Sequence, residues 1–384
     1  MKKFCLLLLI LIVSCFMVSC VETRYLEKLG LITAVGYDKS ENEEIKGSLV
    51  LYQFNPTQQD VEKILTTKAK TSKGIRLSQN LETDHKLASG QLRVAIYGSE
   101  LASEGIAHLV DTLERDASIG NMVYLAISHS TAEEILTYEM KERPSNMGTY
   151  LYNLLRQNLE SELLVPPTLQ EFITDYGSVG KDPVLPILTA SEGKVGVGGI
   201  ALFHGDKFAK EIDNEKIFYI RSLIEEYKLG SLEVEIPLDK FDSFLLNTNH
   251  YQEEMEEKKQ KLYITLDSIK SNHKIKAKKQ KKPEFTITLN IEARLLEMSE
   301  ELKLSDPKIL NLLEKEISIF LEKNLKETID LLQREGTDPI GFGMEYKTIR
   351  GHQDLTNEKW QTLYKEASFK INVKNKIIRT GVID

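Results

Sequence analysis

The residue best placed to do chemistry in this chain of 384 residues is Cys20, a thiol at the end of an apolar N-terminal segment. Lys2 and Lys3 precede an unbroken apolar run over residues 4–13, and Met17-Val18-Ser19 leads directly into the cysteine. Positive charge followed by a short apolar run is typical of an export signal. Small or apolar residues before a cysteine resemble a bacterial lipobox, in which the thiol receives a diacylglyceryl group and the chain is cut just before it.

We therefore expect residues 1–19 to be a lipoprotein signal peptide and Cys20 to become the lipidated N-terminus. Two alternatives stay open on this pattern. Ile12-Val13-Ser14-Cys15 has nearly the same form, so Cys15 competes as the anchor. An uncleaved signal anchor is the other, although residues 4–18 fall short of the about 20 residues that a membrane-spanning helix needs. The only three cysteines lie in this leader, so cleavage before Cys20 leaves no disulfide and no cysteine metal site.

The other residue types that commonly support catalysis do not have the spacing of a known catalytic or metal-binding motif. The seven histidines include no HExxH motif and no pair spaced i, i+4, so no metal site is expected. His129, between two serines after an apolar run, is the best candidate for a general base, but no GxSxG elbow or reactive cysteine accompanies it. The glycines at 193, 196, 198 and 199 do not fit GxGxxG and predict a strand with a tight turn. We expect no enzyme and no cofactor.

A further candidate surface is a cluster of lysines between Lys270 and Lys282. Its members are Lys270, Lys274, Lys276, Lys278, Lys279, Lys281 and Lys282. The cluster fits either a solvated hairpin face or a contact with anionic lipid. The whole chain has a net charge of −8, and loss of the leader with its two lysines makes it more acidic still. This balance argues against nucleic acid as a partner.

The elements expected to carry these residues fall into two main parts. Residues 31–38 and 45–54 predict a strand hairpin, and a helical pattern over 99–115 between apolar runs at 92–97 and 122–128 predicts a βαβ unit. Thr131 with Glu134 predicts the capped start of another helix. These elements indicate an N-terminal α/β domain over residues 20–190, and a small middle domain or bridging segment is expected over 191–250.

The C-terminal part, residues 251–384, predicts an antiparallel sheet packed with one long helix. Alternating apolar residues indicate strands at 262–269, 274–281, 285–297 and 369–378. The helix is expected to begin at Pro307 after an Asp306 cap and to end at Gly336. The fold class expected is α+β, a multi-domain mixture of α and β. No segment after the leader is apolar enough to cross a membrane, so we expect an ectodomain held at a bilayer by its lipid.

In the order of these parts the chain resembles the Ger(x)C spore germination proteins, the lipoprotein C subunits of germinant receptors. The matching motifs follow the lipobox cysteine in order along almost the whole chain: Val35-Gly36-Tyr37-Asp38; Gly98-Ser99-Glu100-Leu101-Ala102; Leu113-Glu114-Arg115-Asp116; Asp182-Pro183-Val184-Leu185-Pro186; Gly199-Ile200-Ala201-Leu202-Phe203 with Asp206-Lys207; Asp338 to Gly343; Trp360; and Val373 through Lys376, Ile377, Arg379, Thr380 and Gly381. The distance from the cysteine to Gly36 and Asp38 resembles the family's only if Cys20 is the anchor. Val21 departs from the tryptophan that commonly follows the cysteine in the family.

The resemblance implies a mixed α/β protein of three domains, lipid-anchored through Cys20 to the outer face of the spore inner membrane. It also implies two integral membrane partners, the A and B subunits, and a role in the response to small nutrients. On this basis we expect a non-catalytic subunit that is required for germination. The alternative is a solute-binding lipoprotein of a transporter, which would need two similar α/β lobes around a ligand cleft.

Overall fold

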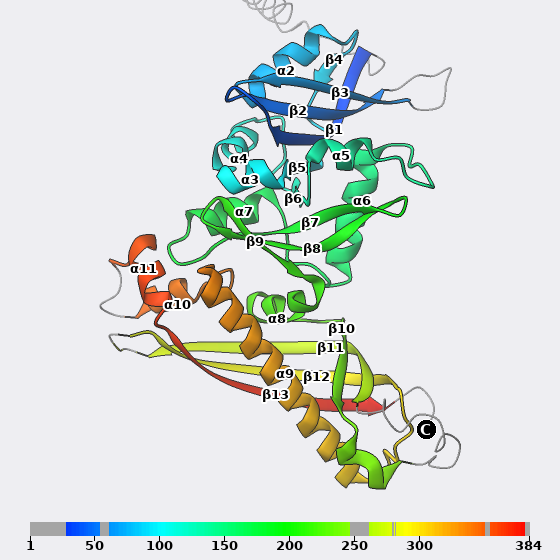
Figure 1. The fold of residues 1–384 in the computed structure, drawn as a ribbon, viewed down its shortest axis with the longest axis vertical. Coiled ribbons are helices and arrows are strands. Elements are labelled where there is room, and N and C mark those ends of the chain that lie inside the picture. Colours follow the sequence, from blue (N-terminus) through cyan, green and yellow to red (C-terminus); the bar gives the residue numbers. More distant parts are fainter. Residues whose placement is uncertain are drawn as a thin grey trace, which may run out of the picture.

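The computed structural model describes residues 28–53, 61–245, 261–278, 280, 282–349 and 354–380. These residues form an elongated molecule with a nine-stranded sheet at one end and a four-stranded sheet at the other (Figure 1). The mixed α/β fold expected from the sequence is confirmed. Both sheets contribute to one continuous hydrophobic core, so they are packed together rather than joined only by the chain.

The first sheet has a parallel centre with antiparallel strands on both sides. Its strands, in the order in which they lie, are β3 (Val61–Ala69), β2 (Ile45–Gln53), β1 (Leu29–Lys39), β5 (Val94–Gly98), β6 (Tyr124–Ser128), β7 (Val184–Ser191), β8 (Lys194–His204) and β9 (Lys207–Asp213), with β4 (Lys86–Ala88) beside β1. The predicted hairpin is β1 with β2, which pair antiparallel, and the predicted βαβ unit connects β5 to the parallel β6. Both predictions are confirmed.

Helices cover both faces of this sheet. They are α2 (Ser72–Leu81), α3 (Ser99–Glu104), α4 (Ala107–Glu114), α5 (Ala132–Thr137), α6 (Met147–Glu160), α7 (Leu169–Gly177) and α8 (Asn214–Ile224). The single helix expected over 99–115 is divided into α3 and α4, because Gly105 adopts a φ of +118° that ends the first helix. Thr131 caps α5 as predicted, since its hydroxyl accepts a hydrogen bond of 3.2 Å from the Glu134 N–H.

Residues 194–213, within the segment expected to be a small middle domain or a bridge, complete the first sheet as β8 and β9. The glycine-rich stretch is the β7–β8 hairpin, as predicted for a strand with a tight turn. Helix α8 then leads towards the second sheet, where Phe218 stacks on Tyr227 with ring centroids 4.8 Å apart. Residues 194–237 therefore contain the last two strands of the first sheet and the first strand of the second.

The second sheet has the order β10 (Gly230–Pro237), β11 (Lys261–Lys278), β12 (Glu284–Met298) and β13 (Ser368–Thr380). The strands expected at 262–269 and 274–281 are one strand, β11, which bends through a bulge where Ser268 has a φ of +49°. The pairs from β10 to β12 are antiparallel, whereas β13 lies parallel to β12. The parallel pairing arises because the long helix α9 (Pro307–Glu335) returns the chain to the end of the sheet where β12 begins.

Helix α9 has the predicted bounds and lies diagonally across one face of the second sheet (Figure 1). Asp306 caps its start by accepting a hydrogen bond of 2.9 Å from the Lys308 N–H, and Gly336 ends it in the left-handed conformation. Its buried stripe comprises Ile309, Leu313, Ile317, Leu321, Leu325, Ile329 and Leu332. Two short helices, α10 (Phe342–Thr348) and α11 (Asn357–Tyr364), separate it from β13.

Candidate functional site

The predicted lipid anchor lies outside the described residues, and so do the competing Cys15 and the signal peptide. Within the described part of the chain, no helix is long and apolar enough to cross a membrane. The candidates that can be built from geometry are therefore the cavities, the buried carboxylates and the charged surfaces.

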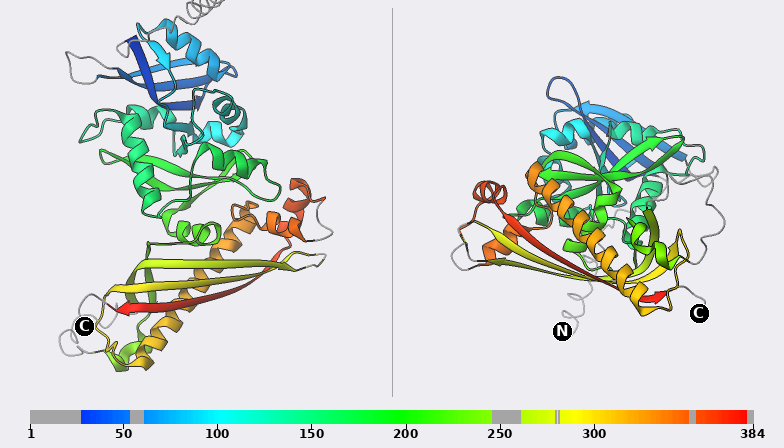
Figure 2. Two further views of the ribbon diagram at one scale, coloured as in Figure 1. Left: turned by 180° about the vertical axis from the view of Figure 1, so that it is seen from behind. Right: turned by 60° about the horizontal axis from the view of Figure 1, so that its bottom comes forward.

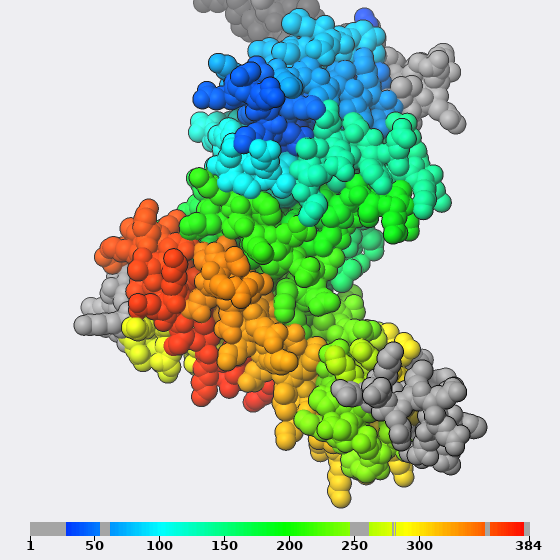
Figure 3. Space-filling model, viewed as in Figure 1, coloured from blue at the N-terminus to red at the C-terminus, as the bar shows by residue number. Residues whose placement is uncertain are grey.

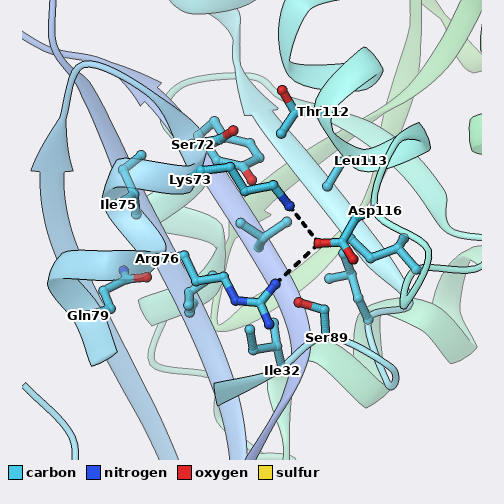
Figure 4. Close-up of a pocket in the computed structure, with 15 residues that line it drawn as sticks. Ile32, Ser72, Lys73, Ile75, Arg76, Gln79, Ser89, Thr112, Leu113 and Asp116 are labelled. Carbon is cyan, nitrogen blue, oxygen red and sulfur yellow. Dashed lines mark hydrogen bonds and ion pairs between the residues drawn. The ribbon is translucent and has the colours of Figure 1, made fainter. Parts of the chain in front are cut away.

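A small pocket lies beneath α2 in the first sheet's half of the molecule (Figure 4). Lys73 and Arg76 of α2 both reach Asp116, with Nζ and Nη1 lying 2.5 and 3.3 Å from its Oδ2. Ser118 donates two more hydrogen bonds to Oδ1 of the same carboxylate. Burial would raise the pKa of Asp116, but the bonds from Lys73 and Ser118 outweigh it and lower the pKa below its usual range.

This pocket suits ordered water better than a nutrient. Its cavity volume is about 40 Å³, room for one or two waters. Asp116 is held ionised by donors on both oxygens, so it cannot accept a proton readily near neutral pH. The buried Gln79 beside it uses its amide nitrogen to tie the carbonyls of Gly47 and Leu65, which fixes α2 to β2 and β3. We interpret the pocket as part of the packing of α2.

A larger cleft, about 680 Å³, lies between β10, the 3-10 turn η2 (Asp239–Phe244) and α9. Its volume falls in the range of small-molecule sites. Two ion pairs line it, with Lys240 Nζ 2.6 Å from Glu316 and Lys261 Nζ 2.5 Å from Glu235, and Asp239, Asp242 and Lys323 add further charge. Oppositely charged groups that already bind each other offer a nutrient little net attraction.

Two buried aspartates, Asp182 and Asp338, join the two halves of the molecule. The Asp338 N–H donates to Oδ2 of Asp182 at 2.8 Å, and the Asp182 N–H donates to the backbone carbonyl of Asp338 at 2.9 Å. Oδ1 of Asp182 accepts a third hydrogen bond, from the Gly205 N–H in the β8–β9 turn. We call this paired-aspartate contact, together with Gly180 and Trp360 beside it, the junction. In Figure 3 the orange and red surface of the C-terminal helices lies against the green surface of the first sheet here.

The Asp338 carboxylate is fully buried and accepts four hydrogen bonds. Gly341 and Phe342 donate their N–H groups to Oδ1 at 2.9 and 3.0 Å, while the Gly343 N–H and the Trp360 indole donate to Oδ2 at 2.9 and 3.0 Å. Burial, followed by the nearby Asp182, raises the pKa of Asp338 to about 7, although the backbone donors oppose this rise. With every acceptor position used, the carboxylate holds the start of α10 and fixes the only tryptophan of the chain.

Gly180 completes the junction by close backbone contact. A Cβ at this position would lie 2.5 Å from the Gly343 Cα, and the Gly180 φ is +81°. Its N–H donates to the Asn357 side chain at 2.9 Å and its carbonyl accepts from the Met344 N–H at 3.2 Å. Phe342 at the start of α10 and Trp360 on α11 are both buried, and both pack on Phe285.

The other aspartates of the motifs also bind backbone amides. Asp38 accepts from the Ala132 and Glu133 N–H groups at 2.6 and 2.9 Å, at the start of α5. Burial raises the pKa of Asp38, and those two donors oppose it. Asp206 accepts from the Ala107 N–H at 3.0 Å, at the start of α4. These carboxylates cap helices and are not free to act on a substrate.

The remaining candidates from the sequence do not converge on these sites. His129 is 65% exposed in its side chain, its Nδ1 lies 2.9 Å from Glu211 on β9, and no hydroxyl or thiol among the described residues is hydrogen-bonded to its ring. No group of three or more histidine, cysteine, aspartate or glutamate side chains in the described ranges could hold a metal ion. The described lysines of the 270–282 cluster lie on β11 and the hairpin after it; Lys279 and Lys281 fall outside the described residues.

Sequence reasoning missed the junction, although both aspartates were noted within motifs. Asp182 and Asp338 are 156 positions apart, so no local pattern indicates their contact. The one shared signal is that each precedes a proline, Pro183 or Pro339, which favours an extended or turn conformation at the aspartate.

Comparison with known proteins gives matches over nearly the whole chain. A model described as the spore germination protein N-terminal domain matches residues 22–190, and one described as spore germination B3/GerAC like, C-terminal, matches residues 198–381. Spore germination protein GerQC of Bacillus cereus is 24% identical over 379 residues, which cover 98% of this chain and 99% of that protein. Spore germination protein KC of Bacillus subtilis (strain 168) is 22% identical over 421 residues, covering 100% and 97%. The crystal structure of the GerBC protein has the same fold, with a TM-score of 0.50 at 16% identity over 90% of this chain and 96% of that one.

Proposed function

The chain belongs to the Ger(x)C family of spore germination proteins, and from that premise we propose that it is the non-catalytic lipoprotein subunit of a nutrient germinant receptor. In this role it is anchored by a diacylglyceryl group on Cys20 to the outer face of the spore inner membrane. Its partners are the integral membrane A and B subunits, and the germination response requires it.

The observation that best supports a non-catalytic role is the use of the motif carboxylates. Asp38, Asp182, Asp206 and Asp338 each accept hydrogen bonds from backbone N–H groups at helix starts or turns. Carboxylates bound to backbone amides stabilise the fold and are not available to act on a substrate. A subunit of this kind is suited to hold its membrane partners or to transmit a signal to them. The alternative, a solute-binding lipoprotein, would need two similar α/β lobes. Here one half has nine strands and the other has four with a single long crossover helix.

The proposal is tested with a Cys20→Ala variant expressed in place of the native protein. We expect it to leave the membrane fraction of spores and to lose the response to specific nutrients while vegetative growth is unchanged. Cys15→Ala is the matched control and should keep both properties. Retention of the Cys20→Ala protein on the membrane would point to another tether, either Cys15 or the apolar leader itself. A normal response to every nutrient in a deletion strain without paralogues would contradict the receptor role.

A further inference from the structure

The second sheet presents one face to α9 and leaves the other face open. Figure 1 shows α9 in front of the strands, and the left view of Figure 2, from behind, shows the strands in front of the helix. Along β11, β12 and β13, buried residues alternate with exposed or half-buried ones, so alternate side chains point away from the helix. Most of the exposed side chains are polar; Tyr263, Leu296 and Ile378 are the large hydrophobic exceptions. This open face lies on a broad side of the molecule rather than at its tip.

Six exposed lysines gather on the open face from two strands that are about 100 positions apart in the sequence. They are Lys270, Lys274 and Lys276 on β11 and Lys370, Lys374 and Lys376 on β13, and we call this surface the basic face. The register brings them together across β12: Lys276 is opposite Thr286, which is opposite Lys370, and Lys270 is opposite Glu292, which is opposite Lys376. Directly opposed residues share one face of a sheet.

The positive charge of the basic face is not neutralised locally. None of its six lysines forms an ion pair with another described residue, and Glu292 is the only acid between them in these rows. The nearby Arg294 and Asp267 bind each other, and Lys278 binds Glu284 at the hairpin end. The acidic Glu233 and Glu235 lie on β10, which pairs only with the 261–269 part of β11, so they border the other end of the sheet.

The remaining side chains of the basic face are small and polar. Between the lysines lie Thr286, Thr288, Asn290 and Asn372, with Asn272 bonded to Asn290 at 2.9 Å. Interfaces between folded proteins are depleted in lysine at their centre and depend on buried aromatic or arginine anchors. The basic face has neither kind of anchor in these rows. A flat array of unpaired lysines instead matches a plane of negative groups, such as the headgroups of a bilayer.

We propose that the basic face binds the surface of a membrane rich in anionic phospholipid. The inference rests on the proposed function, because a lipid-anchored protein already lies beside such a surface. A bacterial lipid anchor is sufficient for retention, so this second contact sets orientation: the molecule lies on its broad side, with α9 turned away from the bilayer. The charge is concentrated on one face of a chain that is acidic as a whole.

Vesicle sedimentation tests this with the chain from Val21 onward, which keeps every described residue and carries no lipid. It should bind vesicles of equal parts phosphatidylcholine and phosphatidylglycerol, release them as salt rises, and ignore pure phosphatidylcholine. Each lysine near an anionic surface contributes about five-fold in affinity. Replacing Lys274, Lys276, Lys370 and Lys374 with glutamine should therefore weaken binding by a few hundred-fold.

The matched control replaces Lys303, Lys308, Lys315 and Lys326 with glutamine, which removes the same charge from exposed positions on or next to α9. We expect this control to bind as the unmodified protein does. Equal losses in the two variants would mean that net charge alone governs binding and would overturn the proposal, as would no binding by the unmodified protein. Tighter binding to soluble polyglutamate than to the anionic vesicles would assign the face to an acidic protein instead.

A variant that is expected to bind more tightly tests the proposal independently of misfolding, because misfolding would weaken binding. Glu292→Gln removes the one acid in these rows and should tighten binding to the anionic vesicles by about five-fold. Unchanged binding by this variant would contradict the role of the basic face. Since the protein used carries no lipid, these results are independent of the Cys20→Ala test, and the two proposals can fail separately.

Discussion

Replacing Asp338 with asparagine should destabilise the protein through its junction. Each carboxylate oxygen accepts two hydrogen bonds, from Gly341 and Phe342 on one side and from Gly343 and Trp360 on the other. The asparagine amide group keeps one oxygen and puts an NH2 where the other was, so two buried donors face a donor. A buried donor without an acceptor costs about 1–3 kcal/mol, which gives a loss of about 2–6 kcal/mol in the free energy of unfolding.

The same substitution should change how stability depends on pH. The Asp338 pKa is about 7 in the folded protein, against an ordinary value of 3.8. A raised acid pKa means that the folded state binds the proton more tightly, so this group's contribution is complete below about pH 4 and is lost as pH rises towards 7. The loss is of order 4 kcal/mol. Asp338→Asn lacks this contribution, so its deficit relative to the native protein should be larger at pH 5 than at pH 8.

Trp360 provides the assay, because it is the only tryptophan in the chain and its indole binds Asp338 directly. Urea unfolding followed by its fluorescence at pH 5, 7 and 8 gives the free energy of unfolding for each variant. Asp330→Asn, at an exposed position of α9, is the matched control and should unfold as the native protein does. A change of less than about 1 kcal/mol in Asp338→Asn at all three pH values would refute this account of the buried carboxylate.

Three further predictions concern single residues. Gly180→Ala should lower the free energy of unfolding by at least about 2 kcal/mol, measured by urea, because its Cβ would lie 2.5 Å from the Gly343 Cα at a φ of +81°; Gly177→Ala, with open space around its Cβ, should change little. Asp38→Ala should cost about 1–2 kcal/mol and speed hydrogen exchange at the start of α5, where two N–H groups lose their acceptor; unchanged exchange there would count against the cap. His129→Gln should leave unfolding and the nutrient response unchanged, since its ring is mostly exposed and, among the described residues, is hydrogen-bonded only to Glu211; loss of the response in a stably folded variant would support a catalytic role instead.

Local signals made most elements predictable from the sequence. Thr131 and Asp306 cap the starts of helices, and Gly336 ends one. Each acts within one helical turn, so neighbouring residues are enough to predict these helix ends. The bulge at Ser268, which makes β11 one long strand, has no such signal, because serine is not a residue type that favours a positive φ. The parallel placement of β13 depends on the direction in which α9 crosses the sheet, and periodicity does not contain that direction.

Contacts between distant segments explain the rest. The lysines at 270–282 stand out in the sequence, but the lysines at 370–376 look unremarkable until the register of β12 with β13 places them on the same face. The junction is similar, since its two aspartates are separated by most of the middle and C-terminal parts of the chain. Sequence shows which residues could bind backbone or lipid, and tertiary pairing decides which of them act together.

The junction and the basic face have a joint consequence for signalling. If Cys20 tethers the N-terminal end and the basic face holds the second sheet on the bilayer, the protein contacts the membrane at two separated places. Two such contacts define one orientation only if the sheets between them are rigidly joined, and the shared core with the Asp182–Asp338 bonds supplies that connection. A protein held in this way can pass a displacement of one sheet to the other. Asp338→Asn should therefore impair the nutrient response even at a temperature where the variant remains folded and membrane-bound.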